Sequence, residues 1–119
     1  MKLGDAFFTA HLWIVCSEPT PQGEVVIFNL TTRKSNSDLN CVVLPSEHPF
    51  VKQESVIAYE RGQLMDSQQW ASVQKLGKMY PPVSKELLLK IQQGALRSDL
   101  TPQKLQRIIQ QQLLSGTKP

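Results

Sequence analysis

The sequence lacks the features that mark several large protein classes. No apolar run approaches the roughly 18 residues that a membrane-spanning helix needs, so we expect no membrane partner. Lys2 is followed by Gly4-Asp5 instead of an apolar segment; the start of the chain therefore does not resemble a signal peptide, and we expect a cytoplasmic protein. Glycine-rich phosphate loops, G-x-S-x-G elbows and paired carboxylates on one face are also missing, which argues against nucleotide-binding, esterase-type and glycosidase functions.

Cysteine and histidine are scarce, with two residues of each. Cys16 and Cys41 lie in apolar, strand-like contexts, and without an export signal we expect buried thiols and no disulfide. His48, between Glu47 and Pro49, is typical of a turn. The histidines and cysteines do not have zinc-binding spacing, so we expect neither a metal nor a cofactor.

Length and composition predict one globular domain over residues 1–119, because the chain has 119 residues with 40% hydrophobic and 19% charged content. The net charge of +3 is unevenly distributed. Residues 1–64 hold five basic and seven acidic residues, whereas residues 65–119 hold eight basic and three acidic ones. The basic half suits a polyanion or an acidic protein partner, but the modest, spread-out excess favours a solvated helical face.

The first 64 residues have the pattern of a small β-structure. Short apolar runs at 6–8, 12–17, 24–30, 41–44 and 55–59 are separated by turn-forming segments, notably the proline- and glycine-containing residues 18–23. Residues 31–40 are polar and predict a loop. Short strands of this kind predict a curled, mostly antiparallel sheet, because an open sheet would leave its edges unprotected. The expected core residues are Trp13, Val15, Ile27 or Val26, Val43 and Ile57.

The remaining residues, 65–119, predict helices. A short helix is expected at 66–70 with Asp66 or Ser67 as N-cap, and residues 78–82 are expected to break the structure. Two further helices, at 84–97 and 102–114, are expected to begin at Ser84 and Thr101 and to form a helical hairpin. The predicted fold class is thus α+β or mainly β.

Four segments, residues 4–8, 11–17, 25–32 and 55–64, resemble segments of the MazF/PemK family of small toxins. Gly4-Asp5-Ala6-Phe7-Phe8 is similar to the opening of that family's barrel. The run from His11 to Ser17 is similar to its second strand, and the run from Val25 to Thr32 to the strand that ends in Thr followed by Ser or Thr. Residues 55–64 are similar to its late Ser-Val strand. The resemblance covers residues 1–64.

The resemblance implies an SH3-like barrel that forms a homodimer, cleaves single-stranded RNA without a metal and is controlled by an antitoxin protein. The family's catalytic threonine or serine corresponds to Thr31, with Thr32 beside it. His11 stands where the family usually has an arginine.

These residues suit such chemistry. An imidazole such as His11 can take up and release a proton near neutral pH, which arginine cannot easily do. Thr31 can donate a hydrogen bond to a phosphoryl oxygen, and Thr32, Arg33 and Lys34 are candidate substrate-binding residues.

Simpler interpretations of the same residues stay open. His11 can be a strand-end histidine with a local hydrogen bond, and the threonines can be ordinary strand residues. The whole chain can be a non-catalytic barrel that acts as a protein-interaction module, or a toxin with another target such as gyrase.

Overall fold

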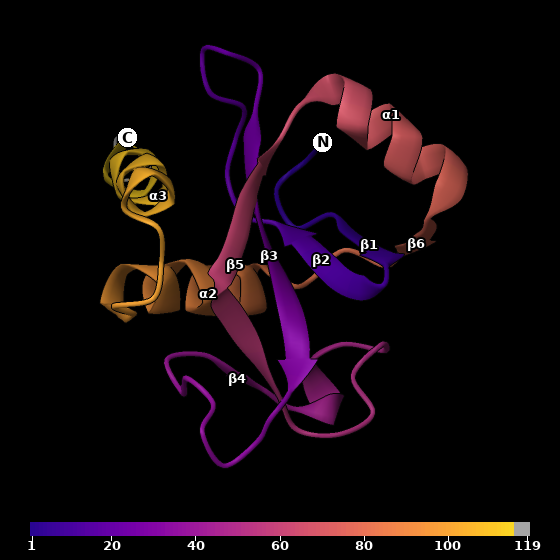
Figure 1. Ribbon diagram of the computed structural model, residues 1–119, viewed down its shortest axis with the longest axis vertical. Coiled ribbons are helices and arrows are strands. Elements are labelled where there is room, and N and C mark those ends of the chain that lie inside the picture. Colours follow the sequence, from indigo (N-terminus) through magenta and orange to yellow (C-terminus); the bar gives the residue numbers. More distant parts are fainter. Residues whose placement is uncertain (116–119) are drawn as a thin grey trace.

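The computed structural model of the protein describes residues 1–115, which form a curled antiparallel sheet and three α-helices (Figure 1). The strand order is β4-β5-β3-β2-β1-β6. The strands are β1 (Ala6–Thr9), β2 (His11–Val15), β3 (Val25–Thr32), β4 (Val42–Val43), β5 (Ser55–Met65) and β6 (Lys78–Tyr80). The helices are the 3-10 turn η1 (Pro45–Glu47), α1 (Ser67–Leu76), α2 (Lys85–Arg97) and α3 (Gln103–Ser115). The predicted α+β class, a curled half-barrel followed by two C-terminal helices, is confirmed.

All five predicted strands are present, with three corrections. Thr31 and Thr32 belong to β3 and not to the loop predicted at 31–40. β5 continues to Met65, well beyond its predicted end. The expected break at 78–82 contains β6, which pairs with the free edge of β1 and stops before Pro81. The three residues of β6 thus form a strand because they pair with the open edge of β1, although their own sequence does not predict one.

The sheet is covered on both faces, as the apolar run of β3 predicts. One face carries the main core, contributed by the strands and by α2 and α3. The other face carries a smaller cluster under α1, in which Phe7 meets the ring of Trp70 edge-on. Trp13, predicted to lie in the core, is only half-buried and packs against this second cluster. The other predicted core residues are buried, namely Val15, Val26, Ile27, Val43 and Ile57.

The helices begin largely where the sequence predicts. Asp66 caps α1 by accepting the Gln69 N–H at 2.9 Å, although α1 runs to Leu76 and not to residue 70. Ser84 caps α2 through the Leu87 N–H at 3.0 Å. Thr101 does not cap α3, because its buried hydroxyl has no hydrogen-bond partner within residues 1–115. The side-chain amide of Gln106 in α3 instead donates to two carbonyls at the end of α2, which joins the two helices.

Helix α2 lies very close to Tyr59 and Asn40 at Gly94. The phenol of Tyr59 on β5 donates a 2.7 Å hydrogen bond to the Ile91 carbonyl, and a Cβ at Gly94 would overlap the Tyr59 oxygen. The same Cβ would lie 2.7 Å from the carbonyl oxygen of Asn40. Only glycine therefore permits this contact.

Both cysteines are buried free thiols, as expected. Burial raises the pKa of Cys16 far above its usual range and that of Cys41 to about 11. The thiols are therefore neutral and unreactive at physiological pH.

Substitution Gly94→Ala is expected to destabilise the protein by about 1 to 3 kcal/mol, the usual cost of overpacking a core. Helix propensity alone predicts the opposite sign, a gain of about 1 kcal/mol. Urea denaturation measures the difference, and Gln93→Ala, on the exposed side of α2, serves as the matched control. An unchanged or raised unfolding free energy in Gly94→Ala would contradict the close approach.

Candidate functional site

The turn between β1 and β2 positions His11. Thr9 pairs directly with His11, and Ala10 between them has a φ of 64°, in the left-handed region that residues with a Cβ rarely adopt. This narrow turn places His11 at the first residue of β2, where its side chain is half-buried. The imidazole makes no hydrogen bond to any other residue in the described part of the chain.

The register of β2 and β3 brings His11 and Thr31 to the same face of the sheet. Trp13 pairs with Asn29, and two residues further along each strand lie His11 and Thr31. Side chains two apart on a strand share a face, so the alternation carries both toward the same end of the sheet. Asn29 is 1% exposed, and its side-chain oxygen has no hydrogen-bond partner among residues 1–115. This row thus includes a buried polar group next to Thr31.

His11, Thr31 and Thr32 line one pocket of about 310 Å³ at the ends of the strands. Thr31 pairs with Val56 and Thr32 with Ser55 on the neighbouring strand β5. The complete lining is Phe8, Ala10, His11, Leu12, Leu30, Thr31, Thr32, Phe50 and Ser55. The pocket therefore combines an imidazole and several hydroxyls with an aromatic and aliphatic wall.

Arg33 and Lys34 do not line this pocket. The guanidinium of Arg33 pairs with the carboxylate of Glu54, so its charge is already partnered. Both basic residues line an adjoining hollow of about 480 Å³, which shares Thr32 with the His11 pocket. Lys34 also borders a third hollow, of about 220 Å³, which shares both Thr31 and Thr32. Arg33 or Lys34 was expected at the rim of the His11 pocket. Both residues instead line neighbouring hollows.

Sequence reasoning missed Ser55 and Phe50 as lining residues. The sequence does indicate that Ser55 begins the fifth strand. Its pairing with Thr32, which brings it to the pocket, depends on the strand register, and the sequence does not give that register. Phe50 lies in a connection without regular structure and reaches the pocket through ring contacts with Phe8 and Tyr80. No short motif in the sequence marks such a residue.

His48 holds the segment that carries Phe50. Its Nδ1 accepts the Phe50 N–H at 3.1 Å, which leaves the proton on Nε2 to be donated to the Pro81 carbonyl at 2.7 Å. His48 is 4% exposed, so this turn histidine is a buried link between the η1 segment and the approach to α2.

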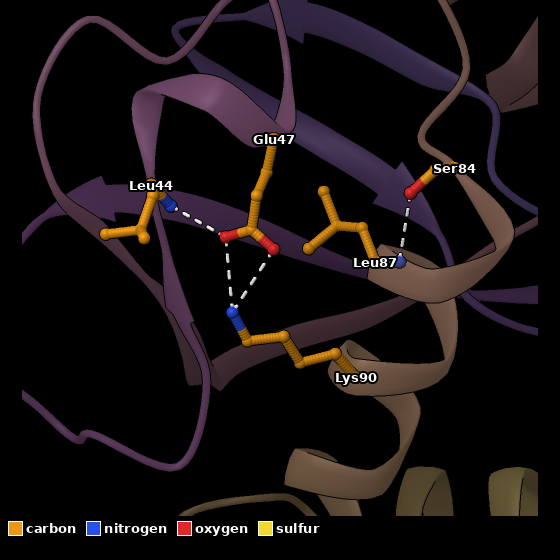
Figure 2. Close-up of polar contacts among 5 residues, drawn as sticks. All are labelled: Leu44, Glu47, Ser84, Leu87 and Lys90. Carbon is orange, nitrogen blue, oxygen red and sulfur yellow. Dashed lines mark hydrogen bonds and ion pairs between the residues drawn. The ribbon is translucent and has the colours of Figure 1, made fainter.

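Glu47 makes a second link between the same elements (Figure 2). Its carboxylate accepts the Leu44 N–H at 2.8 Å and contacts Lys90 of α2 at 3.2 Å. Leu87, one helical turn before Lys90, lies beside this pair with its N–H held by the Ser84 hydroxyl. The segment that carries Phe50, which forms one wall of the pocket, is thus held against helix α2.

Asp38 fastens the loop between β3 and β4. Its carboxylate accepts hydrogen bonds from the Ser98 hydroxyl and from the backbone and side-chain nitrogens of Asn40, the latter two at 2.9 and 2.7 Å. Burial alone would raise the pKa of Asp38, but these hydrogen bonds outweigh it and lower the pKa below its ordinary value of 3.8. The loop that carries Lys34 is thereby tied to the turn between α2 and α3.

No known protein family, curated protein or solved structure matches this chain. Over residues 1–115, no helix is both long and apolar enough to cross a membrane. The same residues contain no group of three or more His, Cys, Asp or Glu side chains arranged to hold a metal ion.

Replacing Ala10 by glycine is expected to stabilise the protein by about 0.5 to 1 kcal/mol, because glycine adopts the left-handed conformation without strain. Ala71→Gly, in exposed helix α1, is the matched control and should destabilise by about 1 kcal/mol. Urea denaturation of both variants measures the effect. A loss of stability in Ala10→Gly would show that the turn is not strained.

The hydrogen bonds to the Asp38 carboxylate predict that the stability of the protein depends on pH. A carboxyl whose pKa is lowered on folding adds stability above its unfolded pKa of about 3.9, and this stability is lost as the pH falls through the folded value. Asp38→Asn should therefore show a shallower loss of stability than the wild type below about pH 4. Thermal denaturation from neutral to acidic pH measures the slopes, with exposed Asp99→Asn as control. Parallel slopes for wild type and Asp38→Asn would contradict the assignment.

Proposed function

We propose that the pocket around His11 and Thr31 cleaves single-stranded RNA without a metal ion, as a toxin-like endoribonuclease does. One observation supports the proposal: His11 and Thr31, which belong to the same face by strand alternation, both line a single open pocket. The pocket is bordered by aromatic and aliphatic side chains against which a base can pack.

The residues can share the work of a transesterification. The ribose 2′-oxygen attacks the neighbouring phosphorus while His11 takes up the 2′-OH proton. The bond from phosphorus to the 5′-oxygen then breaks, leaving a 2′,3′-cyclic phosphate. The departing 5′-oxygen gains a proton, supplied by the protonated imidazole or by water. Thr31 donates a hydrogen bond to a non-bridging phosphoryl oxygen as negative charge builds there.

The positive charge in this proposal comes from Lys34. It borders the hollow that shares Thr31 and Thr32 with the pocket, and no residue within 1–115 forms an ion pair with its ammonium group. A phosphate on the 5′ or 3′ side of the scissile bond can therefore meet Lys34 while the reacting phosphate lies at Thr31. Thr32, at the boundary of all three hollows, contributes a hydroxyl to the substrate.

The remaining parts of the proposal come from the family resemblance. In this proposal the single domain over residues 1–119 forms a homodimer. It acts in the cytoplasm and is controlled by an antitoxin protein. Light scattering at micromolar concentration tests the homodimer directly. The mass of a monomer would contradict this part of the proposal.

Purified protein should cleave single-stranded RNA in the presence of EDTA, and His11→Ala should lose about 100-fold or more of the rate, as expected for a general acid–base residue. Thr31→Val, which removes the hydroxyl but keeps the shape, should also be impaired, whereas Thr31→Ser should retain most activity. Ser72→Ala, on exposed α1, is the matched control for loss of a hydroxyl. Equal cleavage by wild type and His11→Ala would place the activity elsewhere or in a contaminant.

A further inference from the structure

A second hollow lies between α3 and the turn that joins β2 to β3. We call this hollow, of about 470 Å³, the α3 groove. It lies near the start of β3, whereas the His11 pocket lies near its end, so the two occupy opposite ends of the central strand (Figure 1). Its lining comprises Pro19, Thr20, Pro21, Gln22, Lys104, Arg107, Ile108, Gln111, Gln112 and Ser115.

The walls of the α3 groove are fixed before any partner binds. The side-chain amide of Gln112 accepts the Glu18 N–H at 2.7 Å and donates to the Glu18 carbonyl at 2.9 Å, so it pairs with the turn as a backbone amide would. The turn itself closes through the Thr20 N–H to Glu24 and the Gly23 N–H to Thr20, each at 2.8 Å. Pro19 and Pro21 further restrict this wall. Little conformational entropy would be lost on binding.

The charge of the α3 groove has one sign. Lys104 and Arg107 are exposed on adjacent turns of α3, and neither forms an ion pair with any residue within 1–115. None of the lining residues is acidic, and α3 contains no Asp or Glu. Ile108 and the two prolines provide apolar surface between and opposite the charges. An acidic and partly apolar ligand therefore complements the lining of the groove.

We propose that the α3 groove binds an acidic, extended segment of a partner protein. Lys104 and Arg107 are three residues apart on a helix, which separates their Cβ atoms by about 5 to 6 Å. Carboxylates at alternate positions of an extended chain lie on one side and repeat about every 6.6 to 6.8 Å. An acid–any–acid sequence thus matches the two cations, while a nearby apolar side chain packs against Ile108 and Pro21. The side-chain amides of Gln22 and Gln111 are placed to hydrogen-bond the backbone of such a segment.

A protein segment fits better than RNA because the groove offers aliphatic and proline surface without an aromatic side chain for a base to stack on. Its distance from the His11 pocket also means that binding here does not require RNA cleavage. The inference therefore does not depend on the proposed RNA cleavage.

Fluorescence anisotropy with a labelled peptide of alternating glutamate and leucine tests the proposal. We expect Lys104→Glu combined with Arg107→Glu to weaken binding about tenfold or more, equivalent to about 1.4 kcal/mol. Pro21→Asp leaves α3 unchanged but adds a carboxylate to the opposite wall, and it should also weaken binding. The matched control is Lys75→Glu combined with Lys85→Glu, which changes the net charge equally at exposed positions outside the groove.

The comparison probes are the same peptide with glutamine in place of glutamate and a single-stranded RNA. Weak binding of the glutamine peptide and near-wild-type affinity in the control variant support the groove. An equal loss of peptide affinity in the control and groove variants would show that binding depends only on net charge. That result would overturn the proposal. RNA binding that depends on Lys104 and Arg107, with no binding of the acidic peptide, would assign the surface to nucleic acid. Circular dichroism confirms that each variant is folded.

Discussion

The two-sided burial of β3 is the constraint on which the rest of the structure depends. Val26 and Phe28 face the main core while Val25 and Ile27 face the cluster under α1, and strands pair with β3 on both sides. A shift by one residue would exchange these two sets of apolar side chains and turn the already buried Asn29 toward the main core. The register is therefore fixed by packing, and the position of Thr31 beside His11 follows from it.

The pocket also depends on contacts that join its loops to the helices. The segment that carries Phe50 is held by His48 and by the pair of Glu47 with Lys90, and the loop before β4 is held by Asp38. Each of these links reaches α2 or the residues that flank it, and α2 packs closely against Tyr59 because Gly94 has no side chain. The geometry of the pocket thus depends on packing in the main core, to which Leu12 and Leu30 also belong.

The sequence predicts the elements of this fold better than it predicts their contacts. The apolar runs and the caps Asp66 and Ser84 depend on local chemistry, which a single sequence records. β6 was missed because it forms only when β1 offers an open edge, and Thr101 failed as a cap because its hydroxyl is turned into the interior. A shared pocket for His11 and Thr31 was predicted from their positions in two motifs of the family resemblance, and both residues line one pocket. Phe50 and the pairing of Arg33 with Glu54 arise from contacts distant in sequence, which no motif records.

The two hollows at the ends of β3 differ in a way that separates their roles. The His11 pocket has titratable and hydroxyl groups with few fixed partners, which suits chemistry on a bound ligand, and its turn includes the strained Ala10. The α3 groove has cations, amides and prolines with rigid walls, which suits recognition without reaction. A partner seated in the α3 groove would not cover His11. The two hollows share no lining residue, so we expect recognition at one and chemistry at the other to act independently.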